Sequence, residues 1–209
     1  MLILVGKSPT TIARDYPHPN VGILISPRRS TDAPTAARNS LPWAADNDCF
    51  NGGLNKDLFV KMLKRSRPSI GGCMWVASPD VVADADATLD LFDEWVDVIS
   101  GQYGYPIALV AQDGMIGAEV RWLEIDALFI GGSTEWKMSE AAHRLVREAQ
   151  SHGKLVHMGR VNTRRRLELA KAWGVDSVDG TSTVMYTDTY LPGQLEQAAG
   201  GRQTLLDWR

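Results

Sequence analysis

The stretch GVDSVDGT (residues 174–181) decides the fold, because it holds the last of a series of short strand-like runs. The predicted strand Ser177–Val178 follows a glycine that ends a helical pattern, and Asp179 lies where a buried strand would end and a loop would begin. Similar runs alternate with helical patterns along the whole chain, which favours a parallel β/α architecture. The eight candidate strands are Leu2–Val5, Val21–Ser26, Trp43–Ala45, Cys73–Ala77, Ile107–Ala111, Ala127–Ile130, Leu155–Met158 and Ser177–Val178.

Eight strands are the number that closes a β/α barrel. The sequence therefore predicts an α/β fold, a compact (β/α)8 barrel of the TIM type, as a single domain over residues 1–209. Three helical segments between the runs each carry one apolar stripe, which predicts core packing. Residues 27–41 and 47–55 lack this periodicity and are predicted to be loops. The stripes are Leu89, Phe92, Val96 and Ile99; Met138, Ala141, Ala142, Leu145, Val146 and Ala149; and Leu167, Ala170 and Trp173, before Gly174.

Composition excludes several classes of protein. The chain is 44% hydrophobic with a formal net charge of −3, unlike a very basic nucleic-acid-binding domain, so contact with a polynucleotide must be local. The apolar residues 2–5 are too few for a signal peptide or a membrane span. Cys49 and Cys73 have no paired spacing, so neither a disulfide framework nor a zinc site is predicted. We expect a cytoplasmic protein without metal or cofactor.

Polar residues and glycines follow six of the predicted strands. In a β/α barrel the active site lies just past the carboxyl ends of the strands, so these residues should meet at one mouth. Singly, each has a structural explanation, because aspartates cap helices and glycines make turns. Together they predict a pocket for a planar ligand rich in hydrogen-bond donors and acceptors, such as a purine. They are Asp46, Asn47, Asp80, Gln112, Gly131, Gly132, Gly159, Arg160, Asn162 and Asp179.

Motifs over residues 42–181 resemble the tRNA-guanine transglycosylase superfamily. ADNDCF resembles its DSGGF segment, SPDVVADADAT its FDECTPYPAT segment, AQDG its QGG, and FIGGS its glycine loop. HMGRVN followed by GVDSVDGT is similar to MGVG followed by GIDMFDC. The combination is closest to the phage and bacterial branch that puts 7-deazaguanines into DNA. The C-terminal zinc-binding appendage of the tRNA enzymes has no counterpart, because no cysteine follows Cys73.

The resemblance implies a role for each matching residue. Asp179 falls on the nucleophile and Asp46 on the acid/base aspartate, while Asp80 falls on the guanine-reading aspartate. The remaining residues that match the base pocket are Asn47, Gln112, Gly131, Gly132, Met158 and Gly159. The implied reaction replaces guanine in DNA with 7-cyano-7-deazaguanine or a derivative, through a covalent aspartyl-glycosyl intermediate. A phage-encoded enzyme would act in the host cytoplasm.

A base inside a duplex cannot reach such a pocket, so the DNA would be flipped or single-stranded. Arg160, Asn162 and Arg164 follow the seventh strand on the active-site side and are candidates to hold phosphates, with simple surface charge as the alternative for the arginines. Trp43, Trp75 and Phe50 are candidate stacking partners, and core packing is favoured for Trp75. His157 lies within a strand and is predicted to be a hydrogen-bonded core residue. Asp176 is the second choice of nucleophile.

Other functions remain open at this point. The same chemistry on tRNA is the nearest, and a non-catalytic barrel that binds a nucleobase or DNA is another. A phosphate-binding barrel is disfavoured, because Asp46 and Asp179 would repel the anion. The sequence leaves the 7-substituent and the oligomeric state undecided, with a homodimer as one alternative. The expected partners are DNA and a 7-deazaguanine, with no membrane.

Overall fold

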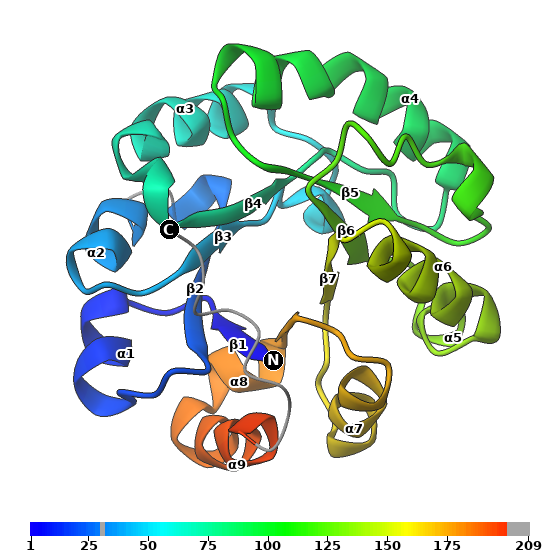
Figure 1. Cartoon of the computed structure of the whole chain (residues 1–209). Helices are drawn as coiled ribbons and strands as arrows, with labels where there is room; N and C mark the ends of the chain where they lie inside the picture. Colours follow the sequence, from blue (N-terminus) through cyan, green and yellow to red (C-terminus); the bar gives the residue numbers. More distant parts are fainter. Residues whose placement is uncertain (30–31, 200–209) are drawn as a thin grey trace.

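Parallel strands close into a barrel in chain order, with the last strand paired to the first (Figure 1). The chain is seen in a computed structural model that describes residues 1–29 and 32–199; residues 30–31 and 200–209, part of the predicted single domain, lie outside the described residues. The predicted (β/α)8 barrel is confirmed. Its strands are β1 (Leu2–Val5), β2 (Val21–Ile25), β3 (Trp43–Ala45), β4 (Cys73–Ala77), β5 (Ile107–Ala111), β6 (Ala127–Ile130), β7 (Leu155–Met158) and β8 (Ser177–Asp179).

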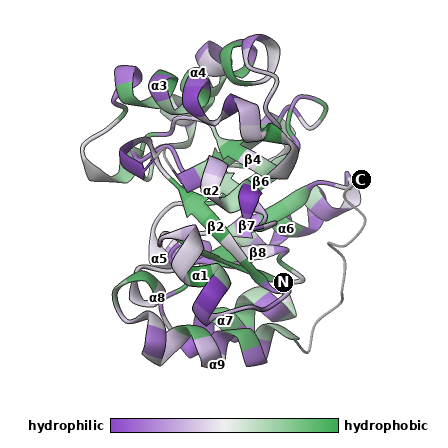
Figure 2. Cartoon of the chain, turned by 90° about the vertical axis from the view of Figure 1, so that its left-hand side faces the viewer, coloured by the Kyte–Doolittle hydropathy of each residue, from purple (hydrophilic) through white to green (hydrophobic). Residues whose placement is uncertain are grey.

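Helices surround this barrel, and Figure 2 shows the apolar strands inside and hydrophilic residues on the outer helix faces. The three predicted stripes lie on α4, α6 and α7, except that Ile99, Met138 and Trp173 fall just outside these helices. Gly174 follows the last of them with a positive φ of 72°. A π-helical turn, Asp97–Gln102, extends α4. The helices are α1 (Pro9–Asp15), α2 (Asp32–Arg38), α3 (Lys56–Ser66), α4 (Ala85–Val96), α5 (Thr134–Lys137), α6 (Glu140–Ser151), α7 (Arg164–Ala172), α8 (Thr181–Met185) and α9 (Thr187–Ala199).

The loop predicted over residues 27–41 is wrong in its second half, where α2 forms. This helix buries only Ala33 and Ala36, both 0% exposed, against the barrel. Two alanines one turn apart give a weak apolar stripe, so tertiary packing rather than periodicity makes this segment helical. The segment 47–55 is a loop as predicted, apart from a single 3-10 turn at Cys49–Asn51.

Strand alternation sorts side chains into two apolar layers. One layer lies between strands and helices and contains, for example, Ile3, Val156 and Met158. The other fills the barrel and contains Trp75 and Phe129. The predicted eighth strand is one residue longer than expected, because Asp179 pairs with Leu4 of β1 and belongs to β8 itself. The sheet therefore fixes the backbone of Asp179, whose side chain is only 18% exposed.

In the described residues, no helix is long and apolar enough to cross a membrane.

Candidate active site

A cavity of about 180 Å³ lies at the carboxyl ends of the strands. It is smaller than the roughly 300 Å³ at the lower end of drug-sized sites, so it suits a small ligand or one ring system of a larger substrate. The structure brings nine of the ten strand-end residues predicted to form the pocket to this cavity. They are Asp46, Asn47, Asp80, Gln112, Gly131, Gly132, Gly159, Arg160 and Asp179. They come from the ends of six different strands, as the TIM-barrel architecture dictates.

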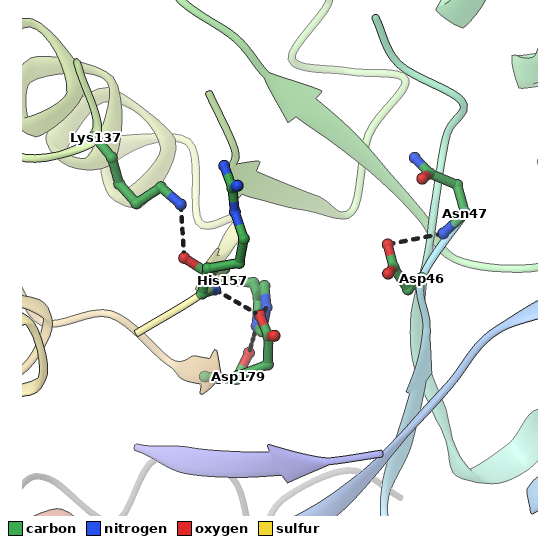
Figure 3. A network of polar contacts seen from close by, with 8 residues as sticks. Asp46, Asn47, Lys137, His157 and Asp179 are labelled. Carbon is green, nitrogen blue, oxygen red and sulfur yellow. Dashed lines mark hydrogen bonds and ion pairs between the residues drawn. The ribbon is translucent and has the colours of Figure 1, made fainter. Parts of the chain in front are cut away.

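Asp46 follows β3 and is half-buried at the cavity wall. Burial, with the charges of Asp179 and Asp80 added, raises the pKa of its carboxyl to about 7. Its Oδ1 accepts a 2.9 Å hydrogen bond from the backbone N–H of Asn47, which orients the carboxyl (Figure 3). A carboxyl with a pKa near neutrality can both give and take a proton, which is the property of a general acid/base.

Asp80 accepts hydrogen bonds from two side-chain amides, which favour its ionised form. Asn47 Nδ2 donates to Oδ1 at 2.7 Å, and Gln112 Nε2 donates to Oδ2 at 2.5 Å. Burial raises the pKa of Asp80, and these two bonds oppose the rise by stabilising the carboxylate. Because each oxygen keeps further lone-pair capacity, the carboxylate is an acceptor surface for N–H groups of a ligand.

Gln112, predicted to be part of the base pocket, lines the cavity, and both ends of its side-chain amide are engaged by the protein. Its Oε1 accepts from the backbone N–H of Ala83 at 2.9 Å, while its Nε2 holds Asp80. Gln112 is therefore chiefly a support for Asp80. A Cβ added at Gly131 would lie 2.9 Å from Gln112 Nε2, so a glycine is needed for this amide to reach its position.

Asp179 lies across the cavity mouth from Asp46, since β8 and β3 are three strands apart in the closed sheet (Figure 3). Its Oδ1 accepts from the backbone N–H of Arg160 and contacts His157 Nε2, each at 3.1 Å. Within the described residues, its Oδ2 has no hydrogen-bond partner. One oxygen is thus anchored, and the other remains available to a ligand in the cavity.

Two cations line the cavity beside Asp179. Lys137, on the short helix α5, is 2% exposed, and its Nζ donates to the carbonyl of Gly159 at 2.7 Å. Burial lowers the pKa of Lys137 to about 8; Arg160 adds to this effect and Asp179 opposes it. Arg160 donates from Nη2 to the carbonyl of Gly132 at 2.7 Å, and its guanidinium lies 4.2 Å from the ring centroid of Phe50. The cavity therefore holds both carboxyl groups and cations, and the two cations lie beside Asp179.

Arg160 has a backbone φ of +56°, a conformation that costs a non-glycine residue about 1–3 kcal/mol. The surrounding bonds over-determine it, because its N–H, its carbonyl and its side chain are all engaged. Strain of this kind concentrates at functional sites, where it fixes geometry. Here it directs the Arg160 N–H at Asp179 and the guanidinium toward the cavity mouth.

Three predicted site residues lie elsewhere. Met158 is on the outer face of β7, 1% exposed among residues that pack against helices, so its side chain cannot touch a ligand in the barrel mouth. Asn162 uses its Oδ1 to accept from the backbone N–H of Ser182 at 3.1 Å. Arg164 pairs with Glu168 on the exposed face of α7 at 2.8 Å. Of the three residues predicted to hold phosphates, Arg160 lines the cavity, whereas Asn162 and Arg164 lie outside it, and their contact with phosphates stays a prediction.

The second-choice nucleophile is placed at the other end of the barrel. Asp176 precedes β8, and its Oδ2 accepts from the backbone N–H of Val156 at 2.8 Å.

Two of the three stacking candidates have no access to the cavity. Trp43 is fully buried in the outer layer, where its Nε1 donates to the carbonyl of Ser69. Trp75 is fully buried inside the barrel. Of the three stacking candidates, only Phe50 lines the cavity.

Sequence reasoning missed Lys137. It falls in the segment GGSTEWK, seven residues past the end of the predicted strand Ala127–Ile130, where a lysine looks like an ordinary surface residue. Its burial is a result of packing, so only its proximity to the strand end could have signalled it. His157 is buried and hydrogen-bonded as predicted, yet one of its partners is Asp179.

A wider depression of about 790 Å³ lies on the outer surface along α3. It is lined mainly by cations of one helix, Lys56, Lys61, Lys64 and Arg65, beside Trp95. Polar groups from several strands converge on the cavity at the carboxyl ends of the strands, but not on this depression. The cavity at the strand ends is therefore the candidate active site. Among the described residues, no group of three or more His, Cys, Asp or Glu is arranged to hold a metal ion.

Comparison with known proteins shows the fold and no closer relationship. No family model matches the chain, and no curated protein matches it significantly. Among solved structures, ligand-free tryptophan synthase from M. tuberculosis is similar with a TM-score of 0.57 and 13% identity, over 93% of this chain and 88% of that one. A putative dehydratase from Mesorhizobium loti has a TM-score of 0.55 and 13% identity, over 87% of this chain.

Haloferax volcanii malate synthase is similar with a TM-score of 0.50 and 12% identity, over 85% of this chain. The chain spans 55% of the length of the dehydratase and 63% of the malate synthase, less than two thirds of each. Identities this low show a shared barrel architecture and nothing about the reaction, because one fold hosts many unrelated chemistries.

Proposed function

We propose that this protein is a base-exchange transglycosylase that replaces guanine in DNA with 7-cyano-7-deazaguanine or a close derivative. One observation carries the proposal. Asp179, with one oxygen anchored and the other unpaired within the described residues, shares a cavity with Asp46, whose pKa is raised to about 7. Two carboxyl groups in different environments around one glycosidic bond can divide the labour of nucleophile and acid/base.

In the first half-reaction, Asp179 Oδ2 forms a bond to C1′ as the bond from C1′ to N9 of guanine breaks. The electron pair stays on the departing base, which takes the proton of Asp46. In the second, N9 of the incoming 7-deazaguanine attacks C1′, its proton goes to Asp46, and the Asp179 carboxylate leaves. The two half-reactions return both aspartates to their starting states, so no further reactant is needed.

Asp80 supplies base recognition in this proposal. Its carboxylate accepts from N1–H and the exocyclic amine, two adjacent donors that guanine and its 7-deaza analogues share. Adenine presents an acceptor in place of N1–H, so its N1 lone pair would face the buried carboxylate without a hydrogen bond between them, at a cost of about 1–3 kcal/mol or more. Asn47 and Gln112 hold Asp80 in place before the base arrives, which reduces the reorganisation on binding.

The size of the cavity suits the base alone, with the sugar at its mouth beside Asp179. A base stacked in a duplex cannot enter it, so the substrate is a flipped or unpaired nucleotide. Arg160 at the rim supplies a cation for the phosphate backbone. The preference for DNA over tRNA rests on the sequence resemblance, so the experiment must include both polymers.

The test is incorporation of radiolabelled guanine into guanine-containing DNA or into tRNA by the purified protein. Label in DNA supports the proposal, whereas label only in tRNA supports the tRNA enzyme instead. Asp179→Asn should abolish incorporation and the denaturant-resistant protein–DNA adduct that a poor acceptor base traps in the wild type. Asp176→Asn is the matched control, since it makes the same change at the other end of β8.

Tight binding of 7-cyano-7-deazaguanine without incorporation or adduct, on either polymer, would contradict the proposal and support a non-catalytic base-binding barrel. Full activity in Asp179→Asn would contradict the assignment of the nucleophile. Mass spectrometry of nucleosides from the treated DNA identifies the base that has been inserted.

A further inference from the structure

A buried histidine stands directly behind Asp179. His157 lies in the middle of β7, is 0% exposed, and is the register partner of Ser177 on β8. Its Nδ1 is 2.9 Å from Ser177 Oγ, and its Nε2 is 3.1 Å from Asp179 Oδ1 (Figure 3). Ser177 and Asp179 are two apart on a strand and so share its inner face, with His157 between their side chains.

The contacts determine which ring nitrogen carries the proton. Burial lowers the pKa of His157, although the hydrogen bond and charge of Asp179 oppose this, so the ring is neutral at neutral pH and has one N–H. Asp179 is a carboxylate that only accepts, so the N–H is on Nε2. Nδ1 must then accept, and Ser177 Oγ–H is the donor. The hydrogen bonds therefore form a series in which Ser177 donates to His157 and His157 donates to Asp179.

Aromatic rings fix the imidazole in this place. The Trp75 ring centroid lies 4.8 Å from that of His157, and the Phe129 centroid lies 4.5 Å from it in an edge-to-face arrangement. The ring therefore has no room to rotate away from Asp179. Ser177 is 1% exposed beneath it, so it cannot reach a substrate, which excludes a hydrolase triad with Ser177 as nucleophile.

We propose that His157, supported by Ser177, is a positioning residue that anchors Oδ1 of Asp179 and leaves Oδ2 as the atom that attacks C1′. The inference rests on the proposed function, because it concerns the nucleophile of that reaction. The Arg160 N–H completes the anchor on Oδ1, and a Cβ added at Gly159 would come within 3.3 Å of the same oxygen. His157 keeps its proton throughout, and all proton transfer stays with Asp46.

The same anchor assists both half-reactions. Before attack, it removes the rotational freedom of the carboxylate, so less orientation entropy is lost in the transition state. When the bond from Oδ2 to C1′ breaks, the returning negative charge is already solvated by two fixed N–H groups. Loss of the anchor should therefore lower kcat and leave KM for the base almost unchanged, because Asp80 binds the base elsewhere in the cavity.

The experiment compares His157→Phe with His157→Gln. Phenylalanine keeps the ring packing and removes both nitrogens, whereas the glutamine amide can again donate to Asp179. We expect the phenylalanine variant to lose activity on the order of ten- to a hundredfold in kcat, as supporting residues of a site do, with the single-turnover rate of adduct formation falling equally. The glutamine variant should regain most of this loss. Ser177→Ala should lie between them, since it frees the tautomer and keeps Asp179 in place.

A second measurement does not depend on activity. Nitrogen chemical shifts of the His157 ring in the wild-type protein should show a protonated Nε2 and a bare Nδ1. A ring protonated on Nδ1 would overturn the inference, and so would a folded His157→Phe with wild-type kcat. If the wild-type protein exchanges guanine, either of these results leaves the proposed function standing. A wild-type protein that exchanges nothing contradicts the proposed function itself, and this inference with it.

Discussion

Replacing Asp46 by asparagine should change how the stability of the protein depends on pH. The substitution keeps Oδ1, which accepts from the Asn47 backbone N–H, and removes the ionisable group. In the folded protein the pKa of Asp46 is raised from 3.8 to about 7, chiefly by burial. The folded state therefore holds a proton between about pH 4 and pH 7 that the unfolded state has released.

The sign follows from proton linkage. Because the folded state binds more protons in this window, the free energy of unfolding of the wild type falls as the pH rises through it. The rise of about three units in the pKa of Asp46 corresponds to a change of about 4 kcal/mol in the free energy of unfolding, at ~1.36 kcal/mol per unit. This is an upper bound, since Asp46 is only half-buried and lines the cavity. Below about pH 4 the contribution of Asp46 is constant, and above about pH 7 the loss is complete.

The assay is urea unfolding of the wild type and Asp46→Asn at intervals from pH 4 to pH 9. The variant should become more stable relative to the wild type as the pH rises, by up to about 4 kcal/mol, and the difference should level off above pH 7. Asp90→Asn, an exposed change on α4, is the matched control and should track the wild type. A constant difference between Asp46→Asn and the wild type across the whole range would refute a raised pKa at Asp46 and the acid/base role built on it.

Three further predictions test the rest of the cavity. Asp80→Ala should weaken binding of 7-cyano-7-deazaguanine in calorimetry by about 2–3 kcal/mol or more, and should disturb binding more than folding; unchanged affinity would remove Asp80 from the site. Lys137 has a pKa lowered from 10.5 to about 8, so wild-type stability should rise between these pH values by at most about 3 kcal/mol. Lys137→Met should lack this rise in urea titrations, and an identical pH profile would show that the lysine is solvated. Gly159→Ala places a Cβ 2.5 Å from the Phe129 ring and should cost about 1–3 kcal/mol of stability; a wild-type melting temperature would show that the ring moves freely.

The sequence by itself determined the barrel. The eight apolar runs were found to within one residue, because buried parallel strands need continuous apolar runs that the helices between them do not show. The helix that forms where a loop was predicted, α2, depends on two buried alanines that carry almost no periodic signal. The gathering of Asp46, Asp80 and Asp179 at one mouth also followed from the sequence, since the carboxyl ends of all strands in a β/α barrel lie on one side.

The direction of each side chain was decided by the tertiary structure. Met158 and His157 are neighbours on β7 and must face opposite sides, but only the closed sheet shows that His157 faces inward. Asn162 lies past the strand, where its position gives no sign that its oxygen serves the backbone of Ser182.

The electrostatics of the site were decided in the same way. A pKa depends on burial and on charges that are distant in sequence, such as Asp80 and Asp179 around Asp46. Lys137 became a buried cation because α5 packs its side chain under the loop after β7, which puts Nζ against the Gly159 carbonyl. The residue types at the strand ends were thus readable from the sequence, whereas the protonation and pairing that give them chemical roles required the folded barrel.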